Sequence, residues 1–178
     1  MENICWFKEQ TVIRGKHAKY VRKLKEKKIF ERVYDAYIQG ALYGVCSDLK
    51  SEADLNTNEQ PQNIFANVFY NDSDYCLRAL RLVILLDTSL NLSKEEKIRR
   101  IFSFKNGAYE EEKADEMKEN ISLFNKYFYG GIEDIYSRYF KNCINDDDNI
   151  DKMKALIEEF YLLKIKFDEK ILLKEISD

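Results

Sequence analysis

Few side chains in this sequence could form a catalytic or metal site. His17 is the only histidine, so any triad or acid–base pair that needs an imidazole would have to use it. It stands at the start of a lysine-rich segment with no obvious partner, which favours a surface position. The four cysteines, Cys5, Cys46, Cys76 and Cys143, lack the spacing of zinc ligands or of a disulfide framework. We therefore predict no metal site and reduced thiols.

Carboxylates are numerous but do not follow a known catalytic or metal-binding motif. Asp146-Asp147-Asp148 lacks the glycine and the glutamate that an EF-hand loop requires, so we interpret it as a solvated helix-capping loop. The acidic run 110–119 lacks the Glu-x-x-His pairs of a helical di-metal site. The chain also has no glycine-rich phosphate loop and no Gly-x-Ser-x-Gly serine. We predict no catalytic residue and no cofactor, with Glu133 and Asp134 as the carboxylates of an alternative enzyme or small-molecule binder.

Positive charge is concentrated near the start of the chain. The segment from Arg14 to Lys28 holds eight Lys and Arg residues against one acid, Glu26, although the whole chain has a net charge of −3. A helix would place part of this charge along one side, at Lys16, Lys19, Arg22, Lys23 and Lys27. Such a row can follow a phosphate backbone, with an affinity that depends on salt and little on sequence. It can equally be a solvated face opposite acidic neighbours such as 110–119, and both interpretations stay open.

Composition indicates a soluble globular protein. The 178 residues are enough for one substantial core, to which 12 Tyr and 11 Phe would contribute large buried areas. The mean hydropathy is −0.52. The most apolar run, 80–86, is far too short to span a bilayer, and residues 1–10 lack the long apolar region of a signal peptide. We expect a cytoplasmic protein without a membrane partner.

Apolar residues recur at helical spacing along most of the chain, and one proline and six glycines leave few forced turns. This pattern predicts helices over about 16–28, 29–44, 62–70, 73–87, 94–102, 109–129, 132–140 and 150–163. Pro61 suits the first turn of the third helix, and Ser93 with Glu96 forms a capping box for the fifth. Gly130-Gly131 is predicted to end or kink the sixth. Gly40 and Gly44, one turn apart, would let another backbone approach the second.

The fold class that follows is all-α, a compact single-domain bundle of seven or eight helices over residues 1–178. Residues 1–15 would form an N-terminal arm, and residues 169–178 are either a docked helix or a tail. The spacing puts most tyrosines in the core, but some could form a partner-binding rim. The candidates for this rim are Tyr34, Tyr37, Tyr127 and Tyr136.

Two segments together resemble a known family. They are Phe30-x-x-x-Tyr34-Asp35-x-Tyr37, which follows the lysine-rich lead-in at Gly15-Lys16-His17 and continues to Ala41 and Gly44, and Leu123-Phe124-x-x-Tyr127-x-x-Gly130-Gly131-Ile132-Glu133. The combination resembles small helical proteins encoded beside bacterial Dnd phosphorothioate-modification and restriction genes. Because the stretch 62–104 is longer than in those proteins, a sister group of defence-associated subunits is an equal alternative. The resemblance implies a cytoplasmic accessory component of a multi-protein DNA-defence system, with no catalytic residues to transfer.

These observations lead to a functional hypothesis. The chain would be a non-catalytic accessory subunit of a prokaryotic defence system that docks a larger partner protein. Its aromatic surfaces and acidic face would bind the partner, and the basic helix would touch DNA or an acidic patch of the partner. The alternative is an independent nucleic-acid-binding protein that uses the basic helix 16–28.

Overall fold

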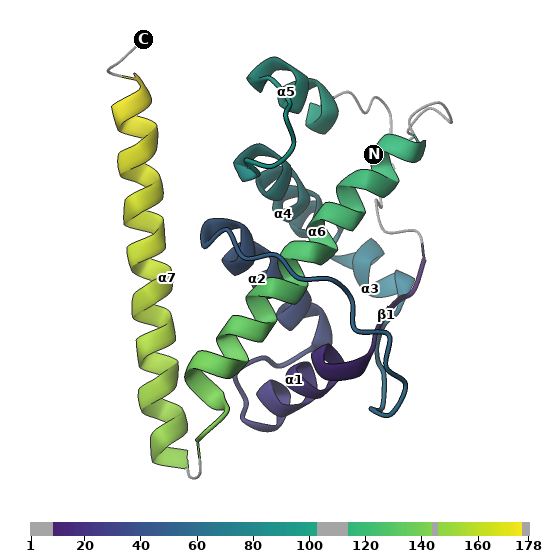
Figure 1. The fold of residues 1–178 in the computed structure, drawn as a ribbon, viewed down its shortest axis with the longest axis vertical. Helices are drawn as coiled ribbons and strands as arrows, with labels where there is room; N and C mark the ends of the chain where they lie inside the picture. Colours follow the sequence, from purple (N-terminus) through teal and green to yellow (C-terminus); the bar gives the residue numbers. More distant parts are fainter. Residues whose placement is uncertain (1–8, 103–113, 144–145, 176–178) are drawn as a thin grey trace.

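The computed structural model describes residues 9–102, 114–143 and 146–175. These ranges contain seven α-helices, one short π-helical turn and a two-stranded sheet (Figure 1). In chain order they are β1 (Thr11–Ile13), α1 (Gly15–Glu26), α2 (Val33–Cys46), β2 (Gln62–Ile64), α3 (Ala66–Asn71), α4 (Ser73–Leu86), α5 (Lys94–Phe102), α6 (Ala114–Ile135), η2 (Tyr136–Phe140) and α7 (Asp146–Glu175). The predicted all-α bundle is confirmed. None of the helices in these ranges combines the length and apolarity needed to cross a bilayer.

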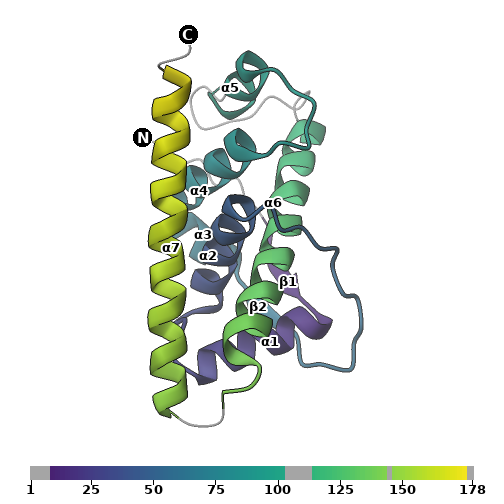
Figure 2. The same cartoon turned by 60° about the vertical axis from the view of Figure 1, so that its left-hand side comes forward.

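Helices α2 and α6 cross at the centre of the bundle, and Figures 1 and 2 both place them side by side. Glycines set their separation. A Cβ atom added to Gly131 would overlap the carbonyl oxygen of Gly40, and one added to Gly44 would overlap the carbonyl oxygen of Tyr127. A glycine within a helix costs about 1 kcal/mol relative to alanine. The close approach of the two backbones explains why this chain keeps glycines at the crossing, as predicted for Gly40 and Gly44.

The core forms around this crossing. The ring of Tyr37 lies 5.1 Å from that of Phe124, 4.9 Å from that of Phe128 and 5.9 Å from that of Phe69, measured between centroids. Its hydroxyl donates a 2.5 Å hydrogen bond to Asn125 Oδ1, so the polar end of the buried ring is satisfied. Helix α4 packs against both α2 and α6, and five of its apolar residues are buried: Cys76, Ala79, Leu80, Val83 and Ile84. Burial of each large apolar side chain contributes about 1.5–3 kcal/mol.

The predicted helix over 62–70 is wrong in its first part. Gln62–Ile64 forms β2, which pairs antiparallel with Thr11–Ile13, and α3 begins only at Ala66. Both strands place an isoleucine in the core, and β2 packs against α1 and α2. Part of the expected N-terminal arm is therefore a strand, and residues 1–8 lie outside the described ranges. Because the two strands are about 50 residues apart, local spacing could not reveal their pairing.

The glycine pair at 130–131 does not end the sixth helix. Helix α6 runs through both glycines to Ile135, and the expected separate helix over 132–140 is its continuation into the π-helical turn. The glycines keep helical backbone because they are placed at a packing contact. The expected start of this helix near residue 109 lies outside the described ranges. Helix α7 extends to Glu175, so residues 169–175 are helix and not a tail.

Substitution of the crossing glycines tests this account. We expect Gly44→Ala and Gly131→Ala each to lower the free energy of unfolding by about 1–3 kcal/mol or more, because the added methyl meets backbone carbonyls that cannot move alone. Gly40→Ala is the matched control, since its Cβ would meet the Phe128 side chain at 3.1 Å. Urea unfolding of the three variants measures the difference. Equal, small losses would contradict a backbone-limited crossing.

Candidate functional site

The predicted basic row lies on α1, and acidic residues distant in sequence pair with it. Lys16 Nζ lies 2.9 Å from Glu133 Oε1 on α6. Arg22 Nη2 lies 2.8 Å from Glu59 Oε2, and Lys19 Nζ lies 3.7 Å from the other oxygen of the same carboxylate. The segment between α2 and β2 and the helix α6 thus supply the negative charge opposite the row.

The rest of the row also has partners within the chain. Lys23 Nζ lies 2.9 Å from Glu26 Oε2 on α1 itself. Lys27 Nζ donates to the carbonyl of Cys143 at 3.2 Å and to Asn149 Oδ1 at 2.9 Å. The acidic partners expected at 110–119 are therefore replaced by Glu26, Glu59 and Glu133, and residues 110–113 lie outside the described ranges. These ion pairs weaken the field that the row presents to a polyanion.

His17 is buried, so its predicted surface position is wrong. The side chain is fully enclosed and its ring lies 4.4 Å from that of Tyr129, measured between centroids. Nε2–H donates to Glu133 Oε1 at 2.7 Å, and Nδ1 accepts the amide of Asp54 at 3.4 Å. Burial lowers the pKa of His17, and this effect exceeds that of the hydrogen bond to Glu133, which alone would raise the pKa. The two ring nitrogens thus serve as one donor and one acceptor, the pattern of a neutral imidazole.

Glu133 collects three donors on one oxygen. In addition to His17, Ser51 Oγ donates to Oε1 at 2.6 Å and Lys16 lies at 2.9 Å. Burial alone would raise the pKa of Glu133, but these hydrogen bonds lower it. A hydrolytic triad needs the serine to bond to the histidine, whereas here both bond to the carboxylate. The arrangement fastens α1, the segment after α2 and α6 to one another and has no nucleophile–base pair.

Asp134, the other carboxylate of the alternative enzyme hypothesis, belongs to a different contact. Its Oδ2 accepts from the Tyr43 hydroxyl at 2.7 Å and lies 2.8 Å from Arg138 Nη2. Arg138 also binds Glu159 on α7 at 2.8 Å. The pair Glu133 and Asp134 is thus split between two structural networks. Across the side chains that the structure describes, no group of three metal-ligating residues gathers.

Three of the four predicted partner-binding tyrosines are core residues. Tyr34, Tyr37 and Tyr127 are buried, so they cannot reach a partner on the surface. Tyr136 is half-buried and stacks on Tyr20 at 4.4 Å between ring centroids. The rim interpretation is therefore wrong for the first three, because their hydroxyls find partners inside the bundle and allow complete burial.

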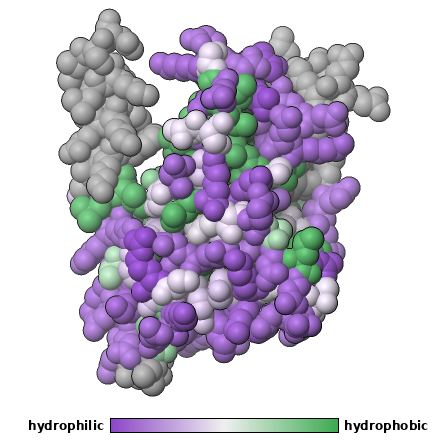
Figure 3. Space-filling view, viewed as in Figure 1, coloured by the Kyte–Doolittle hydropathy of each residue, from purple (hydrophilic) through white to green (hydrophobic). Residues whose placement is uncertain are grey.

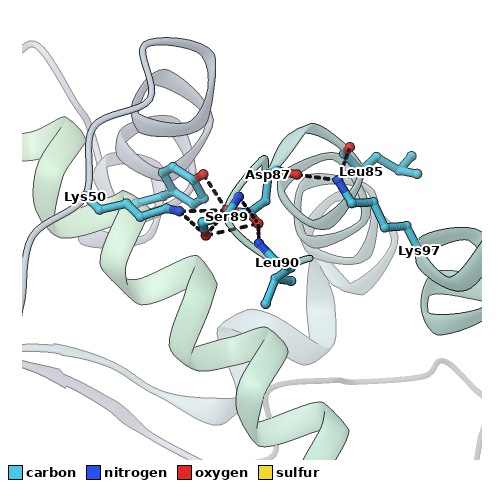
Figure 4. A network of polar contacts seen from close by, with 7 residues as sticks. Lys50, Leu85, Asp87, Ser89, Leu90 and Lys97 are labelled. Atoms are coloured by element: carbon cyan, nitrogen blue, oxygen red, sulfur yellow. Dashed lines mark hydrogen bonds and ion pairs between the residues drawn. The ribbon is translucent and has the colours of Figure 1, made fainter. Parts of the chain in front are cut away.

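Asp87 at the end of α4 is a fully buried carboxylate and a second centre of internal hydrogen bonds (Figure 4). Its Oδ1 accepts from Lys50 Nζ at 2.7 Å and from the Tyr127 hydroxyl at 2.6 Å. Its Oδ2 accepts the amides of Ser89 at 3.0 Å and Leu90 at 2.6 Å. Burial would raise the pKa of Asp87, but these donors outweigh it and lower the pKa to about 2. The only hint of this buried centre in the sequence is that Asp87 directly follows the apolar run 82–86.

Helix α7 leaves an apolar groove against the rest of the bundle. Two cavities of about 260 and 250 Å³ lie along it. The first is lined by Ile29, Phe30, Met153, Leu156 and Ile157, the second by Leu42, Cys46, Leu82, Leu86 and Leu163, and both by Gln39 and Phe160. The shared residues make the two cavities neighbours, and we call the pair the α7 groove. In Figure 3, apolar side chains at the middle of α7 and over α4 and α5 lie on the two sides of a recess.

Each cavity of the α7 groove is smaller than the pockets of about 300–1,000 Å³ that hold small molecules. Its size and apolar lining suit large side chains of another protein. Sequence spacing could not predict the groove, because residues from α2, α4 and α7 form it together. Comparisons with protein-family models, curated proteins and solved structures yield no match to this chain. We therefore infer the function from the geometry of the chain itself.

The Asp87 network makes a prediction about acid stability. The pKa of Asp87 is lower in the folded chain than its unfolded value of about 3.9, so its stabilisation is complete above about pH 4 and is lost as the pH falls towards 2. We expect this loss to be about 1–2 kcal/mol, since Lys50 is partly solvated. Asp87→Asn should be less stable at pH 7 and lack this part of the pH dependence. Urea unfolding at pH 2.5, 4 and 7, with exposed Asp115→Asn as control, measures it; an unchanged slope in Asp87→Asn would contradict the assignment.

Proposed function

We propose that this protein is a non-catalytic accessory subunit that docks a larger partner by accepting an amphipathic helix of that partner in the α7 groove. The observation that carries the proposal is the pair of neighbouring, side-chain-sized apolar cavities along α7. An amphipathic helix presents large apolar side chains at i, i+3, i+4 and i+7, which suits successive cavities in a groove. The bacterial DNA-defence setting and the cytoplasmic location are part of the same proposal.

The edge of the α7 groove supports this proposal. Tyr75, Leu82 and Leu85 on α4 are exposed although they are large and apolar. Tyr75 and Leu82 are seven residues apart and share one side of the helix, and Leu82 also lines the second cavity. The Tyr75 hydroxyl accepts from Gln39 Nε2 at 2.7 Å, which links this edge to the residue common to both cavities. Apolar surface that continues from a cavity to its edge is typical of a protein interface.

Two further observations favour docking over catalysis or independent nucleic-acid binding. Donors within the chain bind the carboxylates of Glu133, Asp134 and Asp87. The carboxylates with the most contacts therefore stabilise the fold. The lysines and arginine of the α1 row are paired within the chain, which favours a partner protein over a polyanion. The two segments that resemble the Dnd-associated family form α2 and α6, the scaffold of the crossing.

Co-expression with the products of neighbouring genes tests the proposal. We expect a tagged chain to co-purify with one of them, and Leu82→Glu to reduce the recovered partner at least tenfold by placing a charge in the second cavity. Leu55→Glu is the matched control, because Leu55 is exposed in the segment between α2 and β2 and does not line the groove. Circular dichroism checks that both variants fold. A wild-type chain that remains alone with every neighbour would overturn the proposal.

A further inference from the structure

Two arginines on α4 differ from most of the arginines that the structure describes. Ion pairs with carboxylates of the chain hold five others: Arg22, Arg32, Arg99, Arg100 and Arg138. No carboxylate of the described residues forms such a pair with Arg78 or Arg81. Arg78 Nε donates to the backbone carbonyl of Asp74 at 3.2 Å, and Arg81 Nε donates to that of Ile101 at 3.1 Å. Each guanidinium has five N–H donors, so most of them stay available to an acceptor from another molecule.

Arg81 is half-buried, although the described chain supplies it with no carboxylate. Its guanidinium carbon lies 4.8 Å from the centre of the Phe102 ring on α5. Burial lowers the pKa of Arg81, because the charged form loses part of its contact with water. A cation that loses water without gaining an anion is unfavourable, and an anion from another molecule would remove this cost.

Arg78 and Arg81, which we call the arginine pair, lie at the edge of the α7 groove. Arg78 is one turn before Leu82, which lines the second cavity, so the two residues share one side of α4. Arg81 follows Arg78 by three residues, which makes the two side chains neighbours on the helix surface. Leu85, one turn after Arg81, is 37% exposed, and Phe102 is 59% exposed. Exposed apolar side chains beside arginines are typical of protein interfaces, where arginine is enriched.

The charges around the arginine pair favour a negative partner. Three carboxylates neutralise the two arginines of α5: Glu96, Glu116 and Glu119. The charged residues of α4 and α5 outside the ion pairs of the described chain are four basic and two acidic, a net charge of +2: Arg78, Arg81, Lys94, Lys97, Asp74 and Glu95. Asp74 is exposed and gives Arg78 only its backbone carbonyl. Electrostatic complementarity therefore selects an acidic segment for this edge of the groove.

We propose that the helix accepted by the α7 groove is acidic on one flank and places side-chain carboxylates on Arg78 and Arg81. This inference rests on the docking function proposed above and adds the chemistry of the partner. Apolar side chains of the helix fill the two cavities, and carboxylates beside them bind the planar forks of the guanidinium groups. Because these charge pairs form at one edge of the groove, they fix the orientation of the bound helix.

Two synthetic amphipathic peptides test this charge selection. Both carry leucine at i, i+3, i+4 and i+7, and one has glutamate while the other has lysine beside this apolar stripe. Fluorescence anisotropy with the full chain measures the two affinities. We expect the glutamate peptide to bind about tenfold more tightly, because its carboxylates meet the arginine pair. This difference should shrink as the salt concentration rises, since ions screen exposed charges.

Removal of the two positive charges tests the residues. The double variant Arg78→Gln, Arg81→Gln keeps side-chain donors for the carbonyls that the arginines bind. It should lower the affinity for the glutamate peptide about tenfold and leave the lysine peptide unaffected or more tightly bound. Arg14→Gln is the matched control and should keep the preference, because Arg14 is exposed, precedes α1 and does not line the groove. Circular dichroism checks that each variant folds.

The outcomes separate this inference from the docking function. Equal affinities for the two peptides, both lost in Leu82→Glu, would leave docking in the groove intact and overturn the acidic partner. Tighter binding of the lysine peptide, or an acidic preference that survives in the double variant, would also overturn it. Duplex DNA that displaces the glutamate peptide and needs the same arginines would assign the pair to phosphate instead. Failure of both peptides to bind would overturn the two proposals together.

Discussion

The near contact between the backbones of α2 and α6 determines what the other side chains of the bundle can reach. The same crossing includes the segment after α2: the amide of Leu49 donates to the Gly44 carbonyl at 2.8 Å, and that of Ser51 to the Lys126 carbonyl at 3.0 Å. A Cβ at Gly130 would overlap the Leu49 carbonyl. Because three stretches of backbone meet here, side chains from one helix reach beyond its neighbour. Tyr127 on α6 reaches Asp87 after α4, and Tyr43 on α2 reaches Glu159 on α7, for this reason.

The parts of the fold that could be predicted are those that depend on local sequence. Apolar spacing located α2 and α4, and the expected cap of α5 is present, since Ser93 Oγ accepts the amide of Glu96 at 3.1 Å. The missed features depend on contacts between distant residues. Strand β2 needs its partner β1, and the glycines at 130–131 remain helical because their small size is required at the crossing. The frequent role of glycine at helix ends predicts a break there, but packing decides its conformation.

The candidate site divides in the same way. Helical geometry placed the basic row on α1, but the identity of its acidic partners depended on how the segment between α2 and β2 folds. His17 was expected at the surface because lysines surround it in sequence, yet Glu133 and Asp54 satisfy both ring nitrogens and allow its burial. A tyrosine combines the apolar ring of a core residue with the hydroxyl of an interface residue. Spacing alone therefore could not assign Tyr34, Tyr37 and Tyr127 to the core or to an interface. The α7 groove has no local signature, since three helices contribute its walls.

The segment between α2 and β2 is irregular, yet contacts hold it at both ends. Lys50 binds Asp87, Ser51 binds Glu133, Asp54 Oδ2 accepts the Lys16 amide at 2.7 Å, and Glu59 binds Arg22. Between these attachments, Leu55, Asn56, Thr57 and Asn58 are exposed. A peptide tag or reporter inserted after Thr57 would therefore extend into solvent without disturbing the bundle, whereas the same insertion after Ser51 would break the connection between three helices.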